Sequence, residues 1–118
     1  MNDELFEQME DLGAEAYDTL DRLGGDEDAY LGYLKEFPQN ENIVKLRAAV
    51  AAGDHEAALS EVHTLKGVTL NLGLLPVSDP CIEMVRLYRA GKPEEADALP
   101  PEVEEQFRIW TDFIKGNC

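Results

Sequence analysis

His63, Lys66 and Gly67 bring together an imidazole, an ammonium and a backbone position without a side chain, all within one turn of a predicted helix. At about 100° per residue, Lys66 lies about 60° to one side of His63, and Gly67 lies about 40° to the other. A neutral imidazole, the main form near neutral pH, keeps a ring nitrogen with a free lone pair. An ammonium beside it balances negative charge. This face of the helix is therefore a candidate site.

The helix that carries these residues is predicted to run from 54 to about 72. Leu59 and Leu70 fall within about 40° of His63. They are interpreted either as ordinary exposed leucines or as the apolar part of a docking patch. The opposite arc is a stripe suited to burial against other helices, and it consists of Ala58, Leu65, Val68 and Leu72, flanked by Val62 and Thr69. If this stripe is buried, His63 must point into solvent.

Each residue of the site also has a plainer interpretation. A lone histidine is more often solvated or a satisfied core group, and Lys66 in isolation is an ordinary surface lysine. Gly67 is compatible with a helix C-cap, but Val68 and Leu72 continue the apolar stripe beyond it, so we disfavour that interpretation. His55 lies about 12 Å before His63 along the axis, too far for both to bind one metal ion, and is expected at the surface.

The segments before this helix are predicted to form short helices. One covers residues 3–11, and a second covers 14–22 and buries Tyr17, Leu20 and Leu23. Asp26 is the expected N-cap of a third helix, which continues to about residue 37. Pro38 then predicts a kink or brief gap before the helical pattern resumes near Ile43 and continues to Gly53.

The segments after it complete the set of helices. Asp79-Pro80 is predicted to be the N-cap and first residue of a helix that ends at Gly91. Pro100-Pro101 separates a short turn from a final helix over about 101–115. The apolar anchors of this last helix are Val103, Phe107, Trp110 and Ile114. Four substantial helices with short connections favour an all-α, antiparallel up-down four-helix bundle, with the additional short N-terminal helices covering one end or side.

Composition limits the partners. The 118 residues allow a single domain, 1–118, and the formal net charge of −15 makes nucleic acid and anionic membranes poor partners. No apolar run is long enough to span a bilayer, and the N-terminus lacks the pattern of a secretory signal, so we expect a cytoplasmic protein. Cys81 and Cys118 form neither a disulfide framework nor a paired metal spacing, so no metal site is expected. Without a long heptad seam, we expect a monomer.

The run His63-Thr64-Leu65-Lys66-Gly67, followed by Leu72-Gly73 and a cysteine-bearing helix ending at Arg89-Ala90-Gly91, resembles histidine-containing phosphotransfer (Hpt) domains. The similarity includes Leu23-Gly24-Gly25-Asp26 and covers roughly 13–115, which leaves 1–12 as an N-terminal helical extension. It implies that His63 accepts a phosphoryl group from the receiver aspartate of a response regulator and passes it to another receiver. It also implies a sensor or hybrid histidine kinase as a partner, Mg²⁺ on the receiver, and no cofactor or kinase activity on this chain.

The resemblance gives roles to individual residues. Lys66 would balance the charge of the phosphoryl group, and Gly67 would allow close approach of the partner. The partner would dock on Leu59, Leu70 and Arg86. Many Hpt domains place a polar residue about 22 positions after the histidine to bond its second ring nitrogen, but here that position is Val85. Glu83, Arg86 or a water are possible substitutes, and the ring without any support is the remaining alternative.

Two other functions stay open. A pseudo-phosphotransfer bundle would bind a receiver or kinase through the same face without carrying phosphate. An unrelated enzyme would use His63 as a general base, which requires a nearby carboxylate and a substrate pocket.

Overall fold

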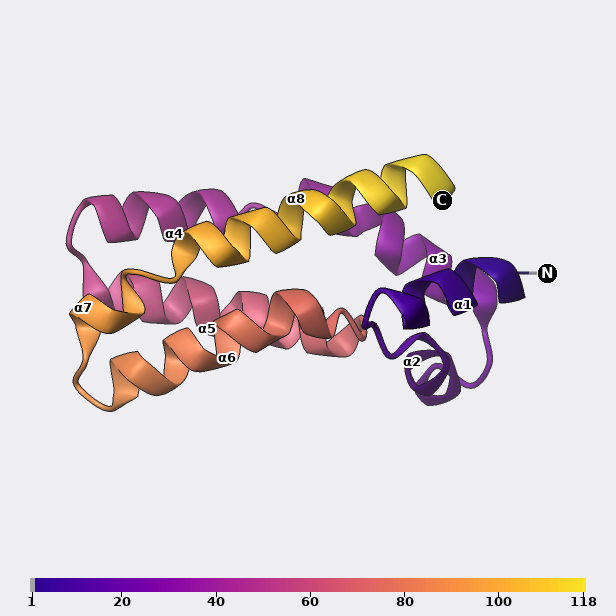
Figure 1. The fold of residues 1–118 in the computed structure, drawn as a ribbon, viewed down its shortest axis with the longest axis horizontal. Helices are drawn as coiled ribbons and strands as arrows, with labels where there is room; N and C mark the ends of the chain where they lie inside the picture. Colours follow the sequence, from indigo (N-terminus) through magenta and orange to yellow (C-terminus); the bar gives the residue numbers. More distant parts are fainter. Residues whose placement is uncertain (1) are drawn as a thin grey trace.

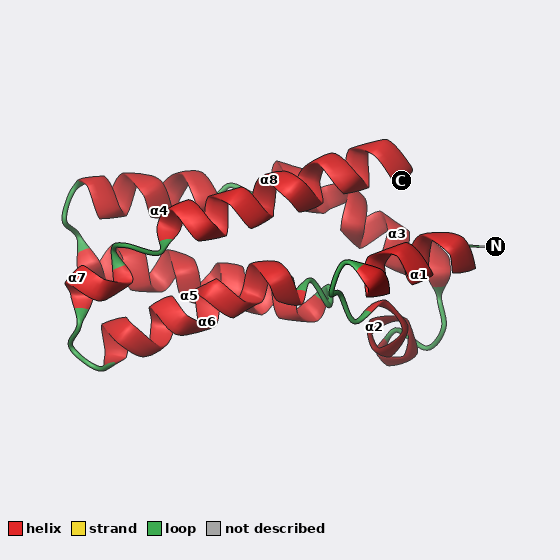
Figure 2. Ribbon diagram, viewed as in Figure 1, coloured by secondary structure: helices red, strands yellow, loops and turns green. Residues whose placement is uncertain are grey.

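The protein is an elongated bundle of helices, 46 × 24 × 21 Å, seen in a computed structural model that describes residues 2–118 (Figure 1). No strand occurs among these residues (Figure 2). The helices are α1 (Asp3–Asp11), α2 (Ala16–Arg22), α3 (Glu27–Glu36), the 3-10 turn η1 (Phe37–Gln39), α4 (Asn42–Ala51), α5 (His55–Asn71), α6 (Leu75–Arg89), α7 (Pro93–Ala96) and α8 (Pro100–Asn117). The expected all-α four-helix bundle is confirmed. One of its four arms is the kinked run α3–η1–α4, and α5, α6 and α8 are the others. None of the described helices combines the length and apolarity needed to cross a membrane.

The kink predicted at Pro38 is confirmed. Pro38 lies in the 3-10 turn η1, after which the chain leaves helical geometry at Asn40, whose ψ is 126°. The Asn40 side chain then accepts a hydrogen bond from the Asn42 amide at 2.8 Å as α4 begins. Asp26 also has its expected role, because its carboxylate accepts from the Ala29 amide at 3.0 Å and so caps α3.

The first three helices gather at one end of the bundle, beside the turn between α5 and α6 (Figure 1). The Glu15 amide donates to the Gly73 carbonyl at 2.8 Å, and the buried Tyr30 hydroxyl donates to the Leu72 carbonyl at 2.7 Å. Burial raises the pKa of Tyr30 to about 12. These bonds satisfy carbonyls at the end of α5 that have no partner within the helix.

The predicted buried face of α2 was wrong in part. Tyr17 is 40% exposed, while Ala16 and Thr19 are fully buried. The Thr19 hydroxyl donates to the Glu15 carbonyl at 2.7 Å, so its burial leaves no unpaired donor. The small side chains of Ala16 and Thr19 face the core because α2 approaches the α5–α6 turn closely.

The predicted start of α6 was also wrong. The helix begins at Leu75, with Pro76 in its first turn, and Pro80 lies inside it. The amides of Val77 and Ser78 already donate to the Leu74 carbonyl. Pro80 removes one hydrogen bond, to the carbonyl four residues earlier. The earlier start lets Val77 and Pro80 join the buried face, which offsets that loss.

Two apolar clusters hold the arms together, and α8 contributes to both. The first lies under the N-terminal helices and contains Trp110 and Ile114 of α8. The second lies in the bundle around α5 and contains Val103 of α8, and Phe107 packs against both clusters while staying half-buried. Both prolines of Pro100-Pro101 lie in the first turn of α8, where a missing amide costs no helical hydrogen bond.

Two glycines test how closely α2 approaches the α5–α6 turn. Gly73 and Gly91 have φ of 73° and 74°, but a Cβ on Gly73 would lie 2.3 Å from the Thr19 hydroxyl oxygen, whereas a Cβ on Gly91 meets nothing within 4 Å. We expect Gly91→Ala to cost about 1–2 kcal/mol from backbone strain alone. Gly73→Ala should cost about 1–3 kcal/mol more, because α2 must shift.

Urea unfolding followed by the fluorescence of Trp110, which is 1% exposed, measures both variants. Equal losses of stability in the two variants would mean that α2 does not pack tightly on this turn.

Candidate functional site

The rotation of α5 about its axis is set by its buried stripe. Ala58, Val62 and Leu65 are fully buried, and they share a cluster with Cys81 and Met84 of α6. Thr69 is also fully buried, and its hydroxyl donates to the Leu65 carbonyl at 2.9 Å. The start of the helix is fixed by the Asp54 carboxylate, which accepts from the Ala57 amide at 3.0 Å.

The stripe is rotated slightly from its predicted position. Val62 and Thr69, expected at its edge, are fully buried, whereas Val68, expected within it, is half-buried. Helices α4 and α6 both pack against α5, and the Asn42 side-chain amide of α4 donates to the Glu61 carboxylate of α5 at 2.8 Å. The rotation leaves the predicted outward direction of His63 unchanged.

His63 is exposed, and among residues 2–118 no side chain or backbone group forms a hydrogen bond or ion pair with its ring. Lys66 is half-buried, so its stem packs on the helix surface, and within the same residues its ammonium forms no ion pair. A Cβ added to Gly67 would meet nothing within 4 Å. Nothing inside the described protein therefore requires glycine at 67, or holds the imidazole or the ammonium in place.

The two leucines predicted for docking are only partly available. Leu59 and Leu70 are both half-buried, and Leu59 packs against the bundle cluster. Arg86 is exposed on α6, but its guanidinium donates two hydrogen bonds to Glu83, at 2.9 and 2.5 Å. This contact lowers the pKa of Glu83. Lys66 is thus a more available positive charge beside His63 than Arg86 is.

Val85, which stands where many Hpt domains have a polar residue that bonds the histidine ring, is apolar and lies inside the bundle. Val85 is 3% exposed and belongs to the cluster that buries α5. Helices α5 and α6 form a hairpin about Gly73, so His63, ten residues before it, lies level with residues near Glu83, ten after it. Glu83 and Arg86 bond each other there. Of the alternatives open from the sequence, a ring without a protein partner fits the described residues.

Two candidate contact residues were missed by sequence reasoning. Ile82 is 41% exposed on α6, four residues before Arg86, and Asn71 is exposed eight residues after His63 on α5. The signal for Ile82 was present, because it interrupts the polar face formed by Asp79, Arg86 and Arg89. Asn71 carries no such signal, since an asparagine near a helix end is common.

His55 lies at the surface, as expected, and is the first residue of α5. Its Nε2 is 3.2 Å from the Asp97 carboxylate, which also accepts from the Tyr88 hydroxyl. Burial and the Asp97 contact raise the pKa of Tyr88 above its usual value. This histidine is engaged within the protein, in contrast to His63. Among residues 2–118, no group of three His, Cys, Asp or Glu side chains is placed to hold a metal ion.

Comparison with known proteins identifies the family. The family model described as Hpt domain matches residues 34–110, about two-thirds of the 118-residue chain. Curated proteins and solved structures gave no significant match. The matched region contains all of α4, α5 and α6, and excludes α1 and α2. A match of this extent on an all-helical bundle shows that the chain belongs to the Hpt domain family, whose members are phosphocarriers in the histidine phosphotransfer of two-component signalling.

Proposed function

We propose that this chain is a phosphorelay intermediate that accepts a phosphoryl group on His63 from the aspartate of one receiver domain and passes it to another receiver. The observation that carries the proposal is the exposed imidazole of His63 on α5, which has no bonding partner among the described residues, in a chain of the Hpt family. A free ring nitrogen beside a free ammonium is what such a transfer requires.

The transfer step exchanges one bond for another. The lone pair of a His63 ring nitrogen attacks the phosphorus of the aspartyl phosphate, and the nitrogen–phosphorus bond forms as the bond to the aspartate oxygen breaks. The aspartate leaves as a carboxylate with that electron pair, and the ring releases its N–H proton to solvent. Charge on the three equatorial oxygens persists through the step, and Lys66 lies close enough along the helix to balance part of it. Onward transfer reverses these events on the second receiver.

The partners follow from this chemistry. Hpt domains interact with response-regulator receivers and with histidine kinases in general. In our proposal the receiver supplies the leaving carboxylate and the Mg²⁺ ion, so that His63 needs no cofactor on its own chain. The net charge of −15 would repel an acidic receiver pocket, and Lys66 offsets that charge where the two proteins meet.

His63→Gln tests the acceptor. A panel of phosphorylated receivers should label the wild-type chain with phosphate that is acid-labile and base-stable, the behaviour of a phosphoramidate. We expect His63→Gln to abolish this label completely, because an amide offers no nucleophilic ring nitrogen. His55→Gln is the matched control and should keep full labelling, since His55 lies about 12 Å from the site.

Label that survives in His63→Gln would overturn the site assignment. A wild-type chain that binds receivers but takes no label from any of them would support the pseudo-phosphotransfer alternative instead.

Lys66→Ala separates chemistry from docking. We expect it to slow transfer at saturating receiver by about a hundredfold, since it removes a charge that stabilises the transferring group. Receiver affinity should change by no more than about threefold, because the Lys66 ammonium reaches solvent and a solvated charge contributes little to binding. Lys115→Ala, on the last turn of α8, removes an exposed lysine far from His63 in the sequence and should change neither quantity. Equal losses of rate and affinity in Lys66→Ala would contradict the charge-balancing role.

Gly67→Ala tests whether the glycine serves the partner. Gly67 and Gly32 both lie inside helices with open space where a Cβ would stand. Either change to alanine should raise the free energy of unfolding by about 1 kcal/mol, from helix propensity. Only Gly67→Ala should slow transfer, by about tenfold or more, because the methyl group displaces the incoming receiver from His63. If both variants transfer at the wild-type rate, Gly67 does not mark the point of closest approach.

A further inference from the structure

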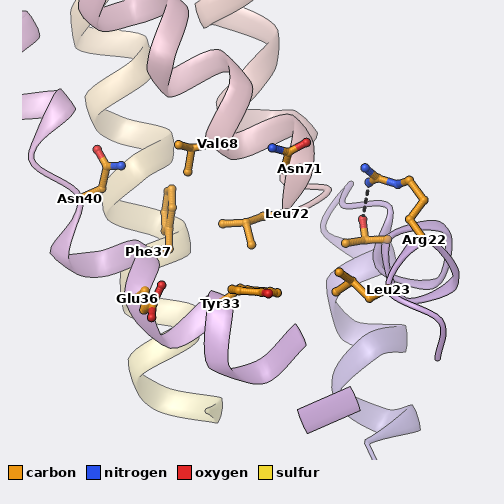
Figure 3. Close-up of a pocket in the computed structure, with 10 residues that line it drawn as sticks. Arg22, Leu23, Tyr33, Glu36, Phe37, Asn40, Val68, Asn71 and Leu72 are labelled. Carbon is orange, nitrogen blue, oxygen red and sulfur yellow. Dashed lines mark hydrogen bonds between the residues drawn. The ribbon is translucent and has the colours of Figure 1, made fainter. Parts of the chain in front are cut away.

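A pocket of about 570 Å³ opens where the N-terminal helices meet the end of α5 (Figure 3). The apolar part of its lining, which we call its floor, consists of Leu23, Phe37, Val68 and Leu72. Polar groups surround this floor, and they come from α2, from the α3–η1 segment and from the last turn of α5. A cavity of this size with an apolar floor and a few polar groups at its rim is typical of a binding site.

The pocket is continuous with the face that carries His63. Gly67 and Asn71 follow His63 at intervals of four residues, so the three form one row along α5 that turns by about 40° at each step. Asn71 lines the pocket, about 12 Å along the helix from His63. The middle of this row has no side chain. A docked partner can therefore approach α5 closely at Gly67 and reach both His63 and the pocket.

The two sides of the pocket rim carry opposite charges. Arg22 and Glu36 are the charged groups among the described residues that line it, and they stand on opposite sides in Figure 3. The Arg22 guanidinium donates to the Thr19 hydroxyl at 3.0 Å and to the Leu70 carbonyl at 3.4 Å. Those bonds hold one guanidinium nitrogen near the rim, and since a guanidinium has five donors, it keeps several for a partner.

We infer that this pocket receives an apolar side chain of the docked receiver, with a receiver carboxylate on Arg22. The inference rests on the proposed function and adds a role for α2, which lies outside the part of the chain matched to the family. Since α2 supplies Arg22 and borders Leu23, it makes the pocket selective for some receivers over others. The bundle matched to the family then carries out phosphotransfer, and the N-terminal helices help to determine which receiver binds.

The test compares transfer kinetics from a panel of phosphorylated receivers to the full chain. Arg22→Ala removes the rim cation, and Asn71→Trp places a large side chain at the mouth of the pocket while keeping that cation. We expect either change to raise KM for the preferred receiver about tenfold, to leave the rate at saturation within about twofold, and to reduce the difference between preferred and poor receivers.

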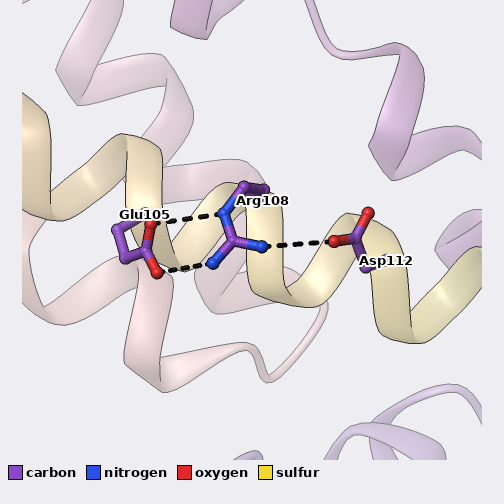
Figure 4. A network of polar contacts seen from close by, with 3 residues as sticks. All are labelled: Glu105, Arg108 and Asp112. Carbon is purple, nitrogen blue, oxygen red and sulfur yellow. Dashed lines mark hydrogen bonds and ion pairs between the residues drawn. The ribbon is translucent and has the colours of Figure 1, made fainter.

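Arg108→Ala is the matched control. Arg108 lines a second pocket, between α4 and α8, and is bound there to Glu105 and Asp112 of its own helix (Figure 4). Its removal should leave every KM unchanged. Urea unfolding checks that all three variants fold. The surface carboxylates of the preferred receiver are then changed to alanine one at a time. With the carboxylate that meets Arg22 removed, Arg22→Ala should no longer raise KM, and a double-mutant cycle detects this coupling.

Three results would overturn this inference while leaving the proposed function intact: KM values for all receivers within twofold of wild type in both variants, an equal rise for every receiver, or a fall in the saturating rate alone. Absence of His63 label from every receiver in the wild-type chain would instead overturn the proposed function, and this inference with it.

Discussion

The rotation of one helix about its axis is the constraint on which the site depends. Ala58, Val62 and Leu65 are fully buried, and a helix with 3.6 residues per turn that buries this stripe has only one direction left for His63. The partner helices fix the stripe through close packing, so even a small rotation would open a cavity on one side and force an overlap on the other. The exposure of the imidazole is therefore a consequence of core packing rather than of anything that bonds the ring itself.

Both ends of α5 make contacts of their own with the rest of the protein. Asp54 caps the first turn, and the contacts of His55 with Asp97 tie that end to the segment after α7. At the other end, Tyr30 and the backbone of the N-terminal helices bond the carbonyls of the α5–α6 turn. A rigid helix with an unsupported histidine is well suited to a carrier, because the ring must meet two different receivers and is not committed to either. Val85, in place of a polar partner, is consistent with that freedom.

Much of this was predictable from the sequence, because helical periodicity and capping are local. The outward direction of His63, the Asp26 cap and the kink at Pro38 each follow from a few neighbouring residues. The start of α6 did not, because burial of Val77 and Pro80 is a tertiary gain that outweighs the local signal of Asp79-Pro80. Tyr17 was misplaced for a similar reason, since the close approach of α2 to Gly73 leaves room only for Ala16 and Thr19. The pocket beside Asn71 joins segments far apart in the chain, and no spacing in the sequence indicates it.

Long-range ¹H–¹⁵N correlation spectra of the two histidine rings, recorded before and after exposure to a phosphorylated receiver, test the central claim most directly. The account predicts that His55 holds its proton on Nε2, beside Asp97, throughout the experiment. It predicts that His63 exchanges between both tautomers in the free protein and that one of its nitrogens acquires the shift of a phosphorylated ring after transfer. A His63 ring locked in one tautomer before transfer, or unchanged after it while the protein carries phosphate, would contradict the account.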